Sequence, residues 1–591
     1  MDGRMNARVQ EFLNQAVRGE TVYLPDVRRT FSKAECSIFC DLTLAVGGVR
    51  RWEIRVPAVQ DEAELRFVRE YFYATLYNIL STFGGARMTL SFAKGDAFSR
   101  TLCETLDDVF QVHLPTNKRS GYGKCLNVTD RINAATGKPP FSFALTQEPL
   151  PALPTETAKH SDAVHACRAA VEKAKSSTIC GIDIGGTDIK VVGISGGKIA
   201  AVKEYDWFPA EMARVEQVVE PILLMARVVR AAMSLPSTPE AAELKDQMLK
   251  KGVSDEAMQS AVDTCRTIYG EAPLLDGIGV CFPDVVIDDR IVGGETYKTR
   301  GIRNASVDYE TEFRKLSSLQ TLLLAQCKPH GKVHLSNDGS LAAYTAAVEL
   351  AHSADADSVV SGVFAHTLGT ELGTGWIDET GEIPQIPLEV YNCIIDLGNQ
   401  PARDYYELDA RSVNNFNTGL SGTLQKYCSQ SGAYRLALRI FEEKAPARYA
   451  ELFDKGFLEQ QGGGVFVRQT PNDMRKPLLE HLMRLASEGD AAAEEIFREI
   501  GEYLAVTFEE SEWMLAPKSR ERILFGRFVK HKRCFELMQE GASARNNVQF
   551  VAGDGTLAFT PVMLELKNDP VHTVAQFGQA VGAAYFAASQ L

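Results

Sequence analysis

A short segment rich in glycine is the first candidate for chemistry in this sequence. Asp183 ends an apolar, β-branched run, Gly185 and Gly186 break it, and Lys190 lies in the next strand-like run. Adjacent glycines let backbone N–H groups approach a ligand without Cβ atoms in the way, and such groups bind anionic oxygens. Asp183 could hold Mg²⁺ through water, and Lys190 adds positive charge. The segment predicts a phosphate site, with a plain hairpin turn as the alternative.

A second segment of the same kind covers residues 366–377. It again joins two strand-like runs through glycine and threonine, including Gly369, Thr370 and Gly373. Two separate hairpins of this type could close on one polyphosphate from two sides. The repetition makes phosphate binding a stronger interpretation than either segment gives alone.

Between these segments, Asn337 and Asp338 lie where a short strand gives way to a helix rich in small residues. A carboxylate at such a place could accept the proton of an attacking hydroxyl group. The structural alternative for Asp338 is a turn residue or a helix cap.

The elements that must position these residues follow an alternating pattern after residue 177. Strands are predicted at 178–184, 189–194, 277–282, 332–335, 358–367, 523–526 and 548–551, and helices at 340–350, across much of 430–515, and at 574–589. Strands that alternate with helices over about 410 residues indicate α/β lobes.

The first 150 residues predict a separate α+β domain of unknown role. A hairpin is expected from 37–46 and 51–56, then a helix at 61–83, a strand at 88–92 and a helix at 100–112. Five prolines between 138 and 154 indicate a linker or an extended connection, because proline fixes φ and lacks a backbone donor. The predicted domains are therefore 1–150, a linker and helix at 151–177, a first lobe at 178–355 and a second lobe at 356–591, with the final helix returning to the first lobe.

Composition limits the classes of partner. The 591 residues include 63 Lys and Arg against 77 Asp and Glu, a net charge of −14, which disfavours nucleic acid and anionic membrane surfaces. No run reaches the roughly 18 apolar residues of a membrane span, and the N-terminus lacks a signal-peptide core. Twelve cysteines are too sparse for a disulfide scaffold, so reduced thiols in a cytoplasmic protein are expected.

The ordered set of motifs resembles the actin-like ATPase superfamily, and within it the ROK-type sugar kinases and repressors, over residues 178–591. The matching segments, in chain order, are 183–190, 279–286, Asn337-Asp338, 368–375, 413–424, 523–526 and 577–587. The resemblance implies two ribonuclease H-like lobes hinged about a cleft for Mg-ATP and a sugar, and a possible homodimer.

By that resemblance Asp338 is the catalytic base that deprotonates a sugar hydroxyl. The ATP and phosphate ligands would be Asp183, Gly185, Gly186, Thr187, Lys190, Gly369, Thr370, Gly373 and Gly526, with Asp183 also near Mg²⁺. Asn337, Asn304 and Glu389 would contact the sugar, although a solvated loop position is the alternative for Asn304 and Glu389.

The sequence departs from the family at several places. Asn392 stands where a zinc-ligating His is common, and no cysteine-rich loop follows, so no structural zinc is expected. Glu371 and Asp188 add carboxylates near the two phosphate segments, and Arg527 replaces a second glycine after Gly526. These changes could alter phosphate geometry, add a metal contact or abolish ATP turnover.

The leading hypothesis is an ATP- and Mg²⁺-dependent kinase that acts on a hydroxyl of a sugar or sugar-like polyol. The alternatives are a non-catalytic sugar or nucleotide sensor of the same fold, and an ATPase that drives a partner protein.

Overall fold

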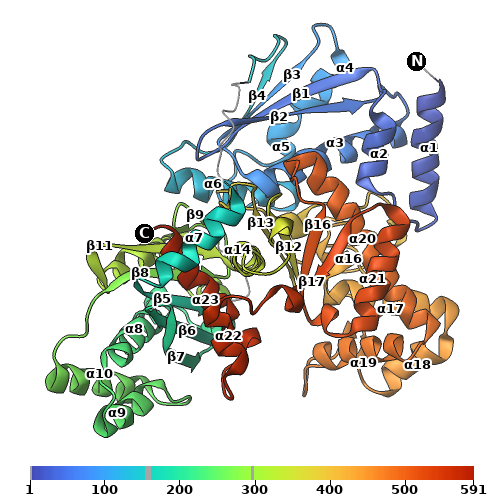
Figure 1. Ribbon diagram of the computed structural model, residues 1–591. Helices are drawn as coiled ribbons and strands as arrows, with labels where there is room; N and C mark the ends of the chain where they lie inside the picture. Colours follow the sequence, from blue (N-terminus) through green and yellow to red (C-terminus); the bar gives the residue numbers. More distant parts are fainter. Residues whose placement is uncertain (1–2, 117, 154–161, 294–298) are drawn as a thin grey trace. The chain divides into compact units, whose positions relative to one another are not determined.

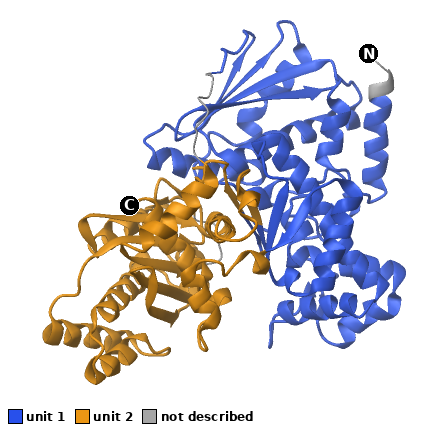
Figure 2. Cartoon of the chain, viewed as in Figure 1, with its two compact units in different colours: residues 1–157, 366–374, 386–552 blue, residues 158–365, 375–385, 553–591 orange. Residues whose placement is uncertain are grey.

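A computed structural model describes residues 3–116, 118–153, 162–293 and 299–591 (Figure 1). The chain divides into two compact units, each built from segments far apart in the sequence (Figure 2). Unit 1 contains residues 1–157, 366–374 and 386–552, and unit 2 contains residues 158–365, 375–385 and 553–591. The N-terminal segment therefore belongs to the same unit as residues 386–552. Part of the predicted linker, residues 154–161, lies outside the described residues.

Unit 2 is built on a five-stranded mixed sheet in the order β11-β8-β5-β6-β7. The strands are β5 (Thr178–Ile184), β6 (Asp188–Ser195), β7 (Lys198–Asp206), β8 (Leu275–Phe282) and β11 (Cys327–Asn337). The first three form an antiparallel meander, and β8 and β11 run parallel to β5. This order is typical of a ribonuclease H-like sheet, so the predicted α/β class and the predicted form of the first lobe are confirmed.

Helices cover both faces of this sheet. On one face the last helix, α23 (Val574–Ser589), lies directly on β5 and β8: a Cβ added at Gly181 or Gly279 would be 1.8 Å from a carbonyl oxygen of that helix. On the other face, Gly193 of β6 packs against α8 (Val215–Ser234). Glycines in the strands and alanines in α23 thus allow a close helix–sheet contact.

The remaining helices of unit 2 connect these strands or pack beside α23. They are α7 (Ala163–Ala174), α9 (Pro239–Leu249), α10 (Asp255–Tyr269), α11 (Arg300–Asn304), α12 (Tyr309–Arg314), α13 (Leu319–Leu324), α14 (Asp338–Leu350) and α22 (Pro561–Asn568). Two short strands, β9 (Val286–Ile287) and β10 (Arg290–Ile291), form a small hairpin after β8.

Unit 1 begins with a four-stranded sheet in the order β2-β1-β3-β4. Its strands are β1 (Cys36–Thr43), β2 (Val49–Val56), β3 (Arg87–Phe92) and β4 (Ser142–Thr146). The β1–β2 hairpin confirms the sequence prediction. Residues 142–146 of the proline-rich stretch form β4, which pairs in parallel with β3 within the region predicted as the N-terminal domain.

The N-terminal helices pack on that sheet and include the long helix α3 (Glu62–Phe83). Its N-terminus is capped by the Asp61 carboxylate, which accepts hydrogen bonds from Ala63 and Glu64, and it ends at Gly84 with φ 64°. Every residue from Tyr71 to Phe83 is buried, so α3 has neighbours on all sides. The other helices are α1 (Gly3–Val17), α2 (Leu24–Phe31), α4 (Ala97–Glu104), α5 (Leu106–Val109) and α6 (Cys125–Ala135).

A second sheet in unit 1 has the order β13-β12-β16-β17. Its strands are β12 (Val363–Leu368), β13 (Leu372–Ile377), β16 (Glu521–Gly526) and β17 (Gln549–Ala552), and residues 366–374 of the first two belong to unit 1. The helical region predicted at 430–515 is confirmed, with one hairpin of β14 (Leu458–Gln461) and β15 (Gly464–Val467) inside it. The helices are α15 (Gln400–Arg403), α16 (Gln425–Cys428), α17 (Gln430–Lys444), α18 (Pro446–Asp454), α19 (Arg475–Ser487), α20 (Ala491–Leu515) and α21 (Lys532–Arg545).

Two global features bear on the sequence predictions. Within the described ranges, the chain has no helix that is both long and apolar enough to cross a membrane. All twelve cysteines are buried and free of disulfide bonds.

Candidate active site

The turn between β5 and β6 is tight and carries the first predicted phosphate segment. The Gly185 N–H donates to the carbonyl oxygen of Asp188 at 2.8 Å. A Cβ on Gly185 would lie 2.7 Å from Oδ1 and 2.8 Å from the carbonyl oxygen of Asp188, so only glycine fits. Buried Trp207 supports the turn, because its indole N–H donates to the Gly185 carbonyl and its backbone N–H to that of Thr187, both at 3.0 Å.

Two charges beside this turn neutralise each other. The Lys190 ammonium forms an ion pair with Asp188, and both side chains are mostly buried. Lys190 is also opposite Asp183 in the β5–β6 register, so both carboxylates belong to the surroundings of a single lysine. The departure at Asp188 therefore weakens the positive charge that the sequence predicted for a phosphate.

Asn337 and Asp338 lie at the junction of β11 and α14. The Asn337 carboxamide caps the helix: Oδ1 accepts from Gly339 and Ser340 at 2.9 and 3.4 Å, while Nδ2 donates to the Asp284 carbonyl at 2.9 Å. Its predicted sugar contact would have to coexist with this capping role. Asp338 is the first helical residue and is partly exposed.

Sequence reasoning assigned no role to Asp284, which lies near the same edge of the sheet. The parallel strands β5, β8 and β11 are neighbours, and Asp183, Asp284 and Asp338 lie at or just beyond their carboxyl ends. Asp284 is only 5% exposed, and its Oδ1 accepts from the Val285 N–H at 2.8 Å. Its position two residues after a largely buried strand was the available signal, since ligands of open α/β sheets bind beyond these strand ends.

The second predicted phosphate turn, between β12 and β13, is open around its glycines. The Gly369 N–H donates to the Glu371 carbonyl at 3.1 Å, and the Gly369 carbonyl accepts from Gln430 at the start of α17 at 3.0 Å. A Cβ would find no atom nearer than 3.7 Å at Gly369 or 3.5 Å at Gly373. Glu371 does not have a positive φ, so its side chain fits this turn without backbone strain.

The glycine that this second turn requires is Gly526, at the end of β16. Its φ is 101°, and a Cβ there would lie 2.2 Å from the carbonyl oxygen of Leu368, the residue before Gly369. Gly526 thus lies against the backbone directly before Gly369. The following residue, Arg527, forms an ion pair with Glu480 of α19 at 3.3 Å.

Buried His366 lies in β12, at the base of the second turn. Its Nδ1 is 3.2 Å from the Thr374 hydroxyl oxygen. Burial, and secondly the positive charge of Arg522, lower the pKa of His366 to about 3. The imidazole is therefore neutral at physiological pH and has a packing role.

Glu389 lies in unit 1, near the second turn. Its carboxylate accepts from the Asn392 carboxamide at 3.0 Å. Burial, and then the carboxylates of Glu389 and Glu371, raise the pKa of Tyr391 well above its usual range, so both carboxylates lie close to one phenol. Sequence reasoning missed Tyr391 as the residue that links them.

The other predicted sugar ligand, Asn304, has a different environment. It is exposed at the end of the short helix α11, after residues 294–298, which lie outside the described part of the chain.

The predicted residues therefore form two groups. Unit 2 contains Asp183, Gly185, Gly186, Thr187, Lys190, Asn304, Asn337 and Asp338, and unit 1 contains Gly369, Thr370, Gly373, Glu389 and Gly526. Among the described residues, no group of three or more His, Cys, Asp or Glu side chains could hold a metal ion.

Comparisons with known proteins gave matches only among solved structures. No family model matches this chain, and the search of curated proteins found no match. The chain is similar to a ROK family glucokinase from Streptomyces griseus in complex with glucose and AMPPNP, at 16% identity and a TM-score of 0.38, covering 69% of this chain and 98% of that one.

The chain is also similar to a second sugar kinase and to a transcriptional regulator. A ROK hexokinase from Thermus thermophilus is 15% identical with a TM-score of 0.37, covering 69% of this chain and 97% of its own. A ROK family transcriptional regulator, a homologue of the E. coli MLC protein, is 12% identical with a TM-score of 0.38. The match covers 70% of this chain and 80% of the regulator. The assignment of a ribonuclease H-like sheet rests on this chain's own strand order.

Proposed function

We propose that this protein is an ATP-dependent kinase that phosphorylates a hydroxyl of a sugar or sugar-like polyol. The observation that carries the proposal is the position of Asp338. It follows strand β11 directly, begins helix α14, and shares the carboxyl edge of the parallel strands with the Gly185 turn.

Asp338 would accept the proton of the sugar hydroxyl as that oxygen attacks the γ-phosphate of ATP. A carboxylate suits this role because phosphoryl transfer depends mainly on positioning and on charge stabilisation. The backbone N–H groups of the Gly185 and Gly369 turns would contribute hydrogen bonds to phosphate oxygens. Asn337 would orient the neighbouring Asp338 through its cap of α14.

The proposed reaction requires Mg²⁺, and one carboxylate of this chain is suited to hold it. Asp183 would hold the ion through water, since Mg²⁺ in nucleotide sites usually retains several water ligands and binds one or two carboxylates. The ion would neutralise negative charge on the phosphates. Within the protein, Asp183 and Asp188 would compete for Lys190. Lys190 lies opposite Asp183 in the β5–β6 register and forms an ion pair with Asp188.

The first test is Asp338→Asn in a coupled assay of ADP release with hexoses, amino sugars, pentoses and inositols. Turnover should fall by about 10²-fold or more, since general-base catalysis contributes about 10²–10⁴-fold. The matched control is Asp246→Asn, which removes an exposed carboxylate from helix α9. Undiminished turnover in Asp338→Asn, with turnover and melting temperature equal to those of the control, would refute the assignment.

A sensor without turnover is a second candidate, and the Asp188–Lys190 ion pair favours it. A carboxylate held against the Gly185 turn repels phosphate, and the lysine that would attract phosphate is occupied. Calorimetry separates the two functions. A sensor binds a sugar or nucleotide with measurable heat and releases no ADP, whereas a kinase releases ADP in proportion to sugar consumed.

A further inference from the structure

We infer that the N-terminal α+β segment positions the predicted sugar-binding loop, with Asn78 as the principal positioning residue. The Glu389 loop is defined here as residues 388–399. This inference rests on the proposed function, in which Glu389 contacts the sugar, and it gives residues 1–150 a role that their own sequence did not reveal.

The backbone of the Glu389 loop is hydrogen-bonded to the N-terminal segment at both of its ends, residues 388–389 and 395–399. The bonds run between Leu388 N–H and Thr82 carbonyl (2.9 Å), Glu389 N–H and Ser81 carbonyl (3.2 Å), Leu24 N–H and Ile395 carbonyl (2.9 Å), Leu397 N–H and Val22 carbonyl (2.8 Å), and Asn399 N–H and Glu20 carbonyl (3.0 Å). Two of these bonds fix the end of the loop that carries Glu389, and both come from the last turn of α3. The loop therefore has its partners on a separate part of the chain.

Asn78 of α3 supplies the central contact of this set. Its side chain is fully buried, its Oδ1 accepts from the Ile394 N–H at 2.8 Å, and its Nδ2 donates to the Ile394 carbonyl at 2.9 Å. The carboxamide thus pairs with Ile394 as a neighbouring strand would. Removing it would leave a buried donor and a buried acceptor of the loop without partners, which is costly.

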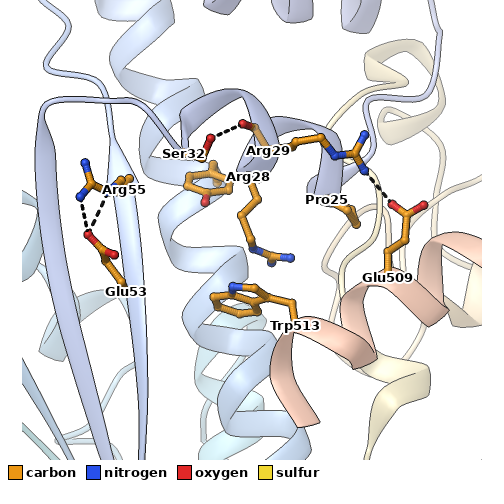
Figure 3. Close-up of a pocket in the computed structure, with 9 residues that line it drawn as sticks. Pro25, Arg28, Arg29, Ser32, Glu53, Arg55, Glu509 and Trp513 are labelled. Carbon is orange, nitrogen blue, oxygen red and sulfur yellow. Dashed lines mark hydrogen bonds and ion pairs between the residues drawn. The ribbon is translucent and has the colours of Figure 1, made fainter. Parts of the chain in front are cut away.

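A buried ion pair fixes the orientation of Asn78. Its Nδ2 also donates to Glu510 of α20 at 3.0 Å, and that carboxylate accepts two hydrogen bonds from Arg28 of α2, at 2.6 and 2.9 Å. The Arg28 guanidinium lies 3.8 Å from the centre of the Trp513 ring, at a cavity of about 360 Å³ (Figure 3). Since Glu510 only accepts, it makes Nδ2 the donating end of the carboxamide and leaves Oδ1 for Ile394.

The opposite side of the loop is held by residues 422–424. The Ile395 N–H donates to Gly422 and the Leu424 N–H to Cys393, both at 2.8 Å. These bonds hold the middle of the loop, whereas Leu388 and Glu389 have their backbone partners on α3. Loss of Asn78 should therefore loosen the middle of the loop first, at Ile394, and the change should reach Glu389 through the residues between them.

The test combines Asn78→Ala with Asn78→Ser, a milder change that replaces the carboxamide by a hydroxyl able to form a hydrogen bond. The matched control is Asn133→Ala, because Asn133 is an equally buried asparagine of the N-terminal segment whose Nδ2 donates to the Gly85 carbonyl at 3.1 Å and not to a residue of the loop. Hydrogen exchange of the full-length proteins is measured over residues 388–399 and over β5 and β6. Sugar KM and kcat are measured on the same samples.

We expect faster exchange in residues 388–399 of Asn78→Ala, a smaller increase in Asn78→Ser, and unchanged exchange in β5 and β6. The sugar KM should rise roughly tenfold with kcat changed less, because the loop would bind sugar without reaching the transferred phosphate. Equal loop exchange in Asn78→Ala and Asn133→Ala would overturn the inference, and so would faster exchange with an unchanged KM. If the wild-type protein phosphorylates no sugar, the proposed function fails, while loop exchange still decides whether α3 holds the loop.

Discussion

The two glycine-containing turns look alike in sequence but are built in opposite ways. At the β5–β6 turn, Gly185 itself is required, because Asp188 fills the space that a side chain would need. At the β12–β13 turn, Gly369 has free space around it, and the required glycine is Gly526, more than 150 residues later in the chain. The surroundings differ as well: the Asp188–Lys190 ion pair flanks the first turn, whereas a neutral buried histidine underlies the second, which also contains Glu371.

This difference teaches that a glycine in a motif has two separate possible roles. One is to satisfy the backbone of its own turn, and the other is to leave room for something outside the chain. Gly185 has the first role in this structure. Gly369 has no such internal steric requirement, so the space around it remains compatible with a ligand.

The largest effect is expected for Gly526→Ala. Its backbone has a positive φ, and the new Cβ would meet a backbone carbonyl that cannot move away without disturbing β12. Strain and overpacking should together lower the free energy of unfolding by about 3 kcal/mol or more. Urea denaturation measures this loss, and a value near zero would show that Gly526 does not support the second turn.

The next largest effect is expected in the pH dependence of stability, through His366, which is buried beneath the second turn. His366 has a pKa of about 3 when folded and about 6.5 when unfolded, so the unfolded state binds more protons between these pH values. Stability should therefore fall as pH falls from 6.5 toward 3, by up to about 1.4 kcal/mol per pH unit from this group. His366→Gln should lack that part of the slope in denaturation curves measured from pH 7 to 5; an identical slope in both proteins would contradict the pKa assignment.

Gly185→Ala and Gly369→Ala test the comparison directly. Gly185→Ala should lower the free energy of unfolding by about 1–3 kcal/mol, because the Cβ must displace Asp188. Gly369→Ala should stay within about 0.5 kcal/mol of the wild type, because nothing lies close enough to clash. Equal losses in the two variants would show that the turns are not built differently. If Gly369 leaves room for phosphate, its variant should instead raise the KM for ATP.

The smallest effect is expected for Asp188→Asn, which keeps the size of the side chain and removes its charge. Lys190 would lose its ion pair and become available to an anion, so the KM for ATP should fall roughly two- to fivefold, ~0.4–1 kcal/mol. The matched control is Asp206→Asn at the end of β7, which removes a partly exposed carboxylate paired with Lys251. An unchanged KM in Asp188→Asn would argue that Lys190 does not contribute to ATP binding.

Much of the fold was predictable because its signals are local. The β1–β2 hairpin, helix α3 and strands β5, β6 and β8 all have a clear periodicity and clear ends, such as the Asp61 cap and Gly84. Strand β4 was missed because its proline-rich neighbourhood has the composition of a linker. Its strand conformation depends on pairing with β3, a contact more than 50 residues away in sequence.

The sequence by itself determined the residue types available for chemistry: glycines at two turns, a carboxylate at the start of a helix, and an acidic chain with scattered cysteines. Only the tertiary structure decided how these residues are used. It pairs Lys190 with Asp188, assigns the required glycine of the second turn to Gly526, and places the N-terminal helix α3 against the Glu389 loop. The physical reason is that backbone propensities act over a few residues, whereas hydrogen-bond partners, burial and close approach depend on segments brought together by packing.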